Sequence, residues 1–151
     1  MDNKDYMEKI LPHKKPMVLI DDVISYSLSE GWLKSIVTIR EDSIFYDKVL
    51  GGVSSIVGIE YMAQTIAAFA FLYSKKEEPQ IGFLLGTRLY NNKHSVFKLG
   101  ETLEILVKQI FFNEDIVSFE CFIYNEEKDE IASATINVYQ NDNIEERLKN
   151  G

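Results

Sequence analysis

The chain has 151 residues, enough for one domain with a substantial core, and its 46% hydrophobic and 26% charged residues are ordinary for a soluble protein. Its net charge of −8 argues against general nucleic-acid binding, which requires a basic surface. One cysteine, Cys121, excludes an internal disulfide, and with only two histidines no Cys/His metal site or other cofactor is expected. The charged N-terminus is unlike a signal peptide and the longest apolar run is short for a membrane span, which predicts a cytoplasmic protein without a membrane segment.

The N-terminal third contains three predicted elements. Residues 6–10 predict a short helix, since a proline follows at position 12. Residues 18–26 and 32–40 are rich in β-branched and aromatic side chains, and the turn residues 29–31 between them predict a hairpin. Residues 41–52 are polar and glycine-containing, and we expect them to be irregular.

A long helix is predicted next. The nearly continuous apolar run 56–72 is typical of a helix buried on almost all sides, with Ser54 or Ser55 as its cap and its end near residues 73–76. Four strand candidates follow, each with β-forming residues or alternating polarity, at 81–90, 102–112, 117–124 and 131–139. One apolar helix must be wrapped by the surrounding strands, so we expect an α+β fold.

Glu60 is the unexpected residue of this helix, because a carboxylate in an apolar segment is costly unless it is paired, hydrogen-bonded or used. One reading is structural: negative charge is favoured near a helix N-terminus. The other is catalytic, since costly charges are enriched at functional sites. Ala63 and Ala67 share the face of Glu60 by helical spacing, and their small side chains leave room beside the carboxylate.

Three separated motifs resemble the hotdog-fold β-hydroxyacyl-(acyl carrier protein) dehydratases. Residues 11–23 read LPHKKPMVLIDDV, similar to the family's opening L-P-H-[RK]-x-P, apolar strand and D-x-V. Residues 60–64 read EYMAQ, like the E-x-x-A-Q of the family's central helix. Residues 83–86 read FLLG and residues 100–103 read GETL, like its F-L-x-G and G-[DE]-x-L. The wording at 58–68 and 81–88 is most similar to the dehydratase-like proteins of aryl-polyene clusters.

The resemblance implies a single hotdog domain with a core at about 11–140 and a flexible tail at 141–151. It implies action on 3-hydroxyacyl thioesters, carried by the phosphopantetheine of an acyl carrier protein, in fatty-acid or polyene-type biosynthesis. A homodimer is expected, with a hetero-oligomer containing another dehydratase-like subunit as the alternative. The implied catalytic residue is Glu60, and the implied substrate-binding residues are Gly58, Ala63, Gln64 and Phe83.

One motif of the family is missing. Its catalytic histidine opens an H-F-P-G-x-P motif about fourteen residues before the glutamate, where this chain has Tyr46 and Asp47. We expect His13 to be structural and His94 to be exposed. Three possibilities remain: Glu60 acts as both base and acid, a histidine enters from elsewhere, or the protein binds acyl groups without dehydrating them. A thioesterase that uses the helix carboxylate, and a non-catalytic partner subunit, are therefore alternatives. Candidate basic residues for carrier docking are Lys14, Lys15, Lys75, Lys76, Arg88, Lys93 and Lys98.

Overall fold

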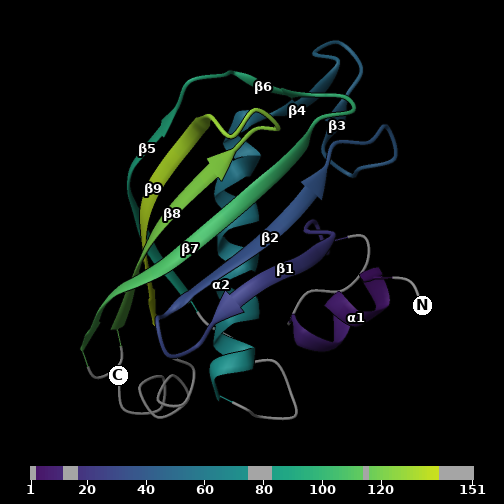
Figure 1. Ribbon diagram of the computed structural model, residues 1–151. Helices are drawn as coiled ribbons and strands as arrows, with labels where there is room; N and C mark the ends of the chain where they lie inside the picture. The colour runs from purple at the N-terminus through teal and green to yellow at the C-terminus, as the bar shows by residue number, and fades with distance from the viewer. Residues whose placement is uncertain (1–2, 12–16, 75–82, 114–115, 140–151) are drawn as a thin grey trace, which may run out of the picture.

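A six-stranded antiparallel sheet curves around one long helix, α2 (Gly58–Ser74), in the computed structural model, which describes residues 3–11, 17–74, 83–113 and 116–139 (Figure 1). The strand order is β1-β2-β7-β8-β9-β5. The strand bounds are β1 Asp22–Ser27, β2 Trp32–Thr38, β5 Phe83–Asn92, β7 Thr102–Asn113, β8 Ile116–Tyr124 and β9 Glu130–Tyr139. This is the α+β hotdog architecture that the sequence predicted, with one long helix wrapped by a six-stranded sheet.

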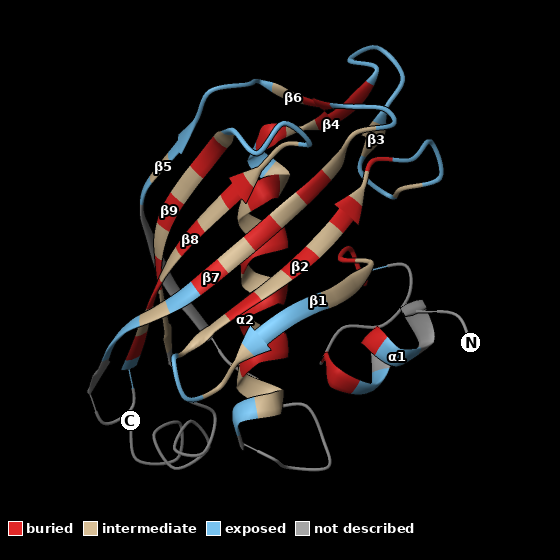
Figure 2. Ribbon diagram, viewed as in Figure 1, coloured by how far each residue is buried: buried red, intermediate tan, exposed pale blue. Residues whose placement is uncertain are grey.

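The sheet and helix meet along alternating buried side chains, which appear as red bands in Figure 2. On β8 the side chains of Val117, Phe119, Cys121 and Ile123 are buried, while the residues between them are only partly covered. This period of two places one face of the strand against α2. Burial also raises the pKa of the Cys121 thiol, so Cys121 is a small core residue, as predicted.

The helix α2 begins differently from the prediction. A 3-10 turn, η1 (Ser55–Val57), precedes it, and the side chain of Ser54 makes no capping hydrogen bond to that turn. The serine cap expected at Ser54 is therefore wrong, because the 3-10 turn lies between Ser54 and α2 and the Gly58 N–H donates to backbone carbonyl oxygens of that turn. By length and composition alone the stretch 55–73 is apolar enough to cross a membrane, but half of it is buried inside the protein, as in the core helix of a soluble protein.

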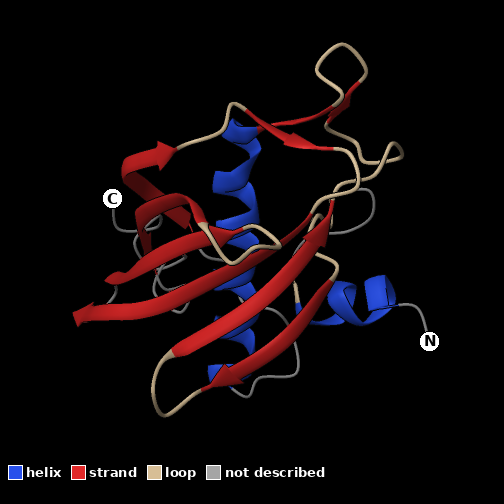
Figure 3. Cartoon of the chain, turned by 45° about the horizontal axis from the view of Figure 1, so that its top comes forward, coloured by secondary structure: helices blue, strands red, loops and turns tan. Residues whose placement is uncertain are grey.

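A second, three-stranded sheet lies at the end of the molecule where α2 begins (Figure 3). Its strands are β3 (Tyr46–Asp47), β4 (Gly52–Ser54) and β6 (Val96–Lys98), in the order β3-β4-β6. The prediction that residues 41–52 are irregular is thus wrong at both strands. The pairing of β4 with β6 depends on close approach, since a Cβ atom at Gly52 would overlap the carbonyl oxygen of Phe97.

The N-terminal segment packs beside α2. Helix α1 (Asn3–Ile10) confirms the predicted short helix, and its Met7 and Ile10 are buried in the common core. The predicted first strand begins at Asp22 instead of residue 18. The reason is that the backbone N–H groups of Leu19 and Ile20 donate to the side chain of Gln64 on α2.

Candidate functional site

Glu60 lies in the first turn of α2 and its side chain is half-buried. Its Oε1 atom is 3.4 Å from Nε2 of Gln64, one helical turn further along the same face. A carboxylate in this position benefits from the positive end of the helix dipole. Partial exposure leaves it within reach of a ligand, which a catalytic carboxylate requires.

Gln64 holds the chain segment 17–20 against α2. Its side chain is fully buried, and its Oε1 accepts from the N–H groups of Leu19 at 2.8 Å and Ile20 at 3.4 Å. Its Nε2 donates to the carbonyl oxygen of Met17 at 2.6 Å as well as to Glu60. These contacts use both ends of the amide within the chain. The predicted contact between Gln64 and substrate therefore has no support from this geometry, and the amide serves Glu60 and the segment 17–20.

Gly58 faces the sheet, on the opposite side of α2 from Glu60. A Cβ atom there would overlap the hydroxyl of Tyr90 and would lie 3.0 Å from Cδ1 of Ile123. The Gly58 N–H donates to the carbonyl oxygen of Ser55, which also accepts from the Tyr90 hydroxyl at 2.5 Å. The space beside Gly58 is thus filled by the protein itself. The structure therefore gives no support for substrate binding on the sheet side of Gly58. The predicted substrate-binding role of this residue stays a prediction.

The remaining predicted site residues differ in what the structure shows of them. Ala63 and Ala67 are half-buried on the side of α2 that carries Glu60, as their spacing predicted. Phe83 is the first residue of β5, and its side chain lies outside the described part of the structure. The fold therefore brings Glu60, Ala63 and Gln64 together along one face.

Two tyrosines near the start of α2 were not singled out by the sequence. Tyr61 is buried and stacks on Phe97 with 6.0 Å between ring centroids. Its pKa is raised by burial, then by the charge of Asp21 and by neighbouring Tyr90. Burial raises the pKa of Tyr90 to about 12. Both hydroxyls therefore stay protonated near neutral pH, and that of Tyr90 donates to the Ser55 carbonyl oxygen.

Comparison with known proteins identifies the family. The model of the ApeP-like family, described as ApeP dehydratase, matches residues 6–149. The chain belongs to this family. The resemblance to dehydratases read from the three motifs is thereby confirmed. A search of curated protein sequences found no match.

Solved structures agree with this assignment. The dehydratase heterocomplex ApeI:P from Xenorhabdus doucetiae matches with a TM-score of 0.83 and 29% identity, over 96% of this chain and 97% of that chain. The smu.793 protein from Streptococcus mutans, bound to acetyl CoA, has a TM-score of 0.65 at 18% identity over 86% and 94% of the two chains. A hypothetical thioesterase with coenzyme A from Streptococcus pneumoniae has a TM-score of 0.63 at 14% identity over 79% and 84%. The last two show the fold alone.

The positions nearest to the missing histidine motif, Tyr46 and Asp47, form strand β3 in this ApeP-like protein. Asp47 is exposed, and its Oδ1 accepts from the N–H groups of Val49 and Leu50 in the turn between β3 and β4. His94 is exposed in the connection between β5 and β6, as predicted. His13 lies outside the described residues. Residues 43–53, where the family motif would lie, contain no histidine.

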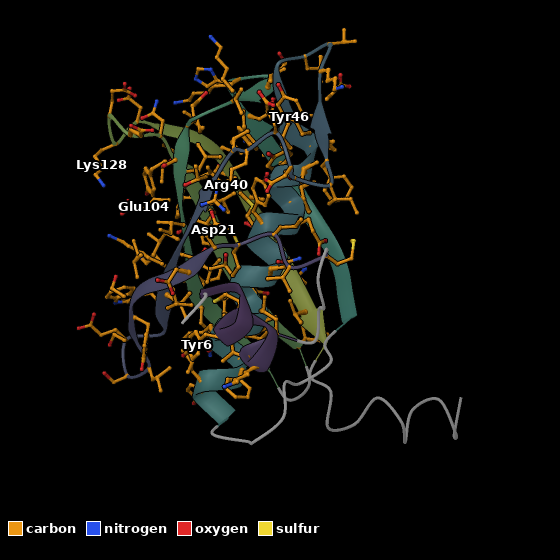
Figure 4. The ribbon with its side chains drawn as sticks, turned by 90° about the vertical axis from the view of Figure 1, so that its right-hand side faces the viewer. Tyr6, Asp21, Arg40, Tyr46, Glu104 and Lys128 are labelled. Carbon is orange, nitrogen blue, oxygen red and sulfur yellow. The ribbon has the colours of Figure 1, made fainter. Side chains whose placement is uncertain are left out.

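A second acidic side chain near the helix, Asp21, was also not predicted as functional. Figure 4 shows Asp21 beside Arg40, whose Nη1 is 3.8 Å from the carboxylate. The other carboxylate oxygen accepts from the Thr38 N–H at 2.6 Å, which ties the start of β1 to the end of β2. Across the described ranges, no group of three His, Cys, Asp or Glu side chains is arranged to hold a metal ion.

Proposed function

We propose that this protein is a subunit of a cytoplasmic dehydratase that removes water from 3-hydroxyacyl groups carried by acyl carrier protein. The observation that carries the proposal is the family match over residues 6–149, together with a half-buried Glu60 at the position of the family's helix glutamate. The aryl-polyene resemblance supports a polyene-type acyl chain as substrate.

Dehydration requires a base that takes the proton at C2 and an acid that protonates the hydroxyl leaving C3. We assign the second task to Glu60: a proton passes from its carboxyl group to the hydroxyl, the C3–O bond breaks and water leaves. The electron pair of the C2–H bond forms the new C2–C3 double bond. The small side chains of Ala63 and Ala67 lie on the same side of α2, and we propose that the acyl chain passes along it.

The base is best explained by a second subunit. The matched structure from Xenorhabdus doucetiae is a heterocomplex of two dehydratase chains. We therefore favour a hetero-oligomer over the homodimer that was first expected. Strand β5 is an edge of the six-stranded sheet, and edge strands need a partner or protection. Tyr90 on β5 touches Ser55 just before α2, so a subunit paired along β5 would lie near the end of α2 whose first turn carries Glu60.

The carrier protein would meet a locally basic part of this acidic chain. Lys93 and Lys98 are exposed on the connection before β6 and at its end. Lys14, Lys15, Lys75 and Lys76 lie outside the described residues, and the side chain of Arg88 is not described. Lys93 and Lys98 are therefore the docking candidates that the structure supports.

The test incubates the purified chain with 3-hydroxyoctanoyl-acyl carrier protein, alone and with an ApeI-type subunit from the same organism. Products are followed by mass spectrometry, and the Glu60→Gln variant serves as the inactive control. Loss of water by wild type supports the proposal. Release of free acid would identify a thioesterase, and an unchanged substrate in every mixture would identify a non-catalytic protein. Light scattering of the same mixtures distinguishes a monomer, a homodimer and a heterocomplex.

A further inference from the structure

We infer that Gln64 is a positioning residue that orients the Glu60 carboxylate and couples it to the backbone segment 17–20. The inference rests on the proposed role of Glu60 in dehydration. It replaces the expectation that Gln64 contacts substrate. Gln64 acts through Glu60 and is not itself a catalytic residue.

The orientation of the Gln64 amide is fixed by its surroundings. Its Oε1 faces two N–H donors, those of Leu19 and Ile20, and an exchange of oxygen and nitrogen would place the NH₂ group against them. The NH₂ group must therefore face the carbonyl oxygen of Met17 and Oε1 of Glu60. Because Gln64 is fully buried, water does not compete for this arrangement.

This arrangement gives Glu60 a donor that does not move. A hydrogen bond from a fixed amide restricts rotation of the carboxyl group and selects which oxygen is turned toward Gln64. The distance of 3.4 Å is long, and catalytic hydrogen bonds commonly shorten when substrate binds. The same amide holds Met17, so a displacement of the segment 17–20 would change the orientation of Glu60.

The first experiment compares the steady-state kinetics of Gln64→Met and Thr65→Val. Each variant is assayed in the complex with the ApeI-type subunit, with 3-hydroxyoctanoyl-acyl carrier protein as substrate. Both variants remove buried hydrogen bonds from adjacent positions of α2, but Thr65 bonds to Ser35 and to the Tyr61 carbonyl, away from Glu60. We expect Gln64→Met to lower kcat about 10- to 100-fold, as for a misplaced catalytic group, with KM within about a factor of two. Thr65→Val should lose a similar amount of stability and keep its kcat. Equal kcat values for the two variants would overturn the inference.

A conservative variant separates two contacts of Gln64. One is the NH₂ group that donates to Glu60, and the other is the oxygen that accepts from Leu19 and Ile20. Gln64→Glu keeps an acceptor for the N–H groups of Leu19 and Ile20, but it places a second carboxylate one turn from Glu60. We expect the basic limb of its pH–rate profile to move to higher pH, because a neighbouring carboxylate disfavours the ionised form of the proton-donating Glu60. An unchanged pH–rate profile with full activity would show that only the hydrogen bonds from Leu19 and Ile20 matter, and not the contact with Glu60.

A spectroscopic measurement does not depend on turnover. The side-chain NH₂ resonances of Gln64, assigned by their loss in Gln64→Met, should move as the carboxylate titrates in wild type and should stay in place in Glu60→Gln. Gln64 NH₂ chemical shifts that do not change with pH in wild type would overturn the inference. A wild-type protein that shows this pH response but removes no water would instead refute the proposed function and leave the contact established.

Discussion

The two sides of α2 are stabilised in different ways. The side toward the sheet is held by packing: Gly58 lies against Tyr90, Tyr61 stacks on Phe97 and Phe69 meets Phe119 edge to face. The other side, at Glu60 and Gln64, is held by hydrogen bonds to a neighbouring backbone segment. Changes on the first side should therefore act on stability, and changes at Glu60 should act on turnover.

The largest expected effect is the loss of activity in Glu60→Gln. Removing a general acid typically costs about 10²- to 10⁴-fold in rate, and glutamine keeps the size of the side chain. We expect kcat to fall by this amount while the melting temperature stays within a few degrees. Mass spectrometry of the products and thermal unfolding followed by circular dichroism measure the two quantities. A variant that is destabilised yet active would assign Glu60 to the structural side of the comparison.

The opposite pattern is expected for Gly58→Ala. The new methyl group would overlap the Tyr90 hydroxyl, and the rearrangement should cost about 1–3 kcal/mol of unfolding free energy, typical of overpacked cores. Tyr90→Phe removes the overlapping hydroxyl, so the double variant should be less destabilised than the sum of the single changes. Urea unfolding of the four proteins measures this coupling. Strict additivity would show that Tyr90 does not determine the need for glycine at position 58.

An effect no larger than that of Gly58→Ala is expected at the buried pair Ser35 and Thr65, whose hydroxyl oxygens lie 2.7 Å apart between β2 and α2. Thr65→Val leaves the Ser35 hydroxyl buried without this partner and should cost about 1–3 kcal/mol. Ser35→Ala leaves Thr65 bonded to the Tyr61 carbonyl and should cost about 0.5–1.5 kcal/mol. The double variant should recover part of the loss, because it removes both polar groups. Chemical denaturation measures the unfolding free energy of each variant. A Ser35→Ala variant that is less stable than Thr65→Val would contradict the expected order.

The smallest effect concerns alkaline pH. The pKa of Tyr90 is raised from its ordinary 10.0 to about 12, so folding favours the protonated form. Its contribution to stability is present below pH 10 and is lost as pH rises from about 10 to about 12. Tyr90→Phe should therefore flatten the decline of unfolding free energy over this range. Denaturation at several pH values measures the slope, and parallel curves for wild type and variant would be the contrary result.

Local sequence patterns determined the architecture. The apolar run 56–72 predicted the central helix, and alternation on residues such as Phe119 and Cys121 predicted strands with one buried face. Three motifs in the right order also identified the family and marked Glu60, because a carboxylate in an apolar helix is conspicuous in any sequence. Each of these features involves residues that are close together in the sequence, so each can be recognised without knowing the fold.

Tertiary structure decided which residues meet. The contact between Gln64 and Met17 joins positions 47 apart, and the Tyr90 hydroxyl reaches Ser55 across 35 positions. The pairing of β4 with β6 likewise brings Gly52 against Phe97, although residues 41–52 look irregular in sequence. Such contacts depend on how the sheet closes around the helix, and no local periodicity encodes that closure. The local sequence therefore predicted the helix and its carboxylate. Only the tertiary structure showed that Gln64 holds the segment 17–20 beside Glu60 and that Gly58 packs against the sheet.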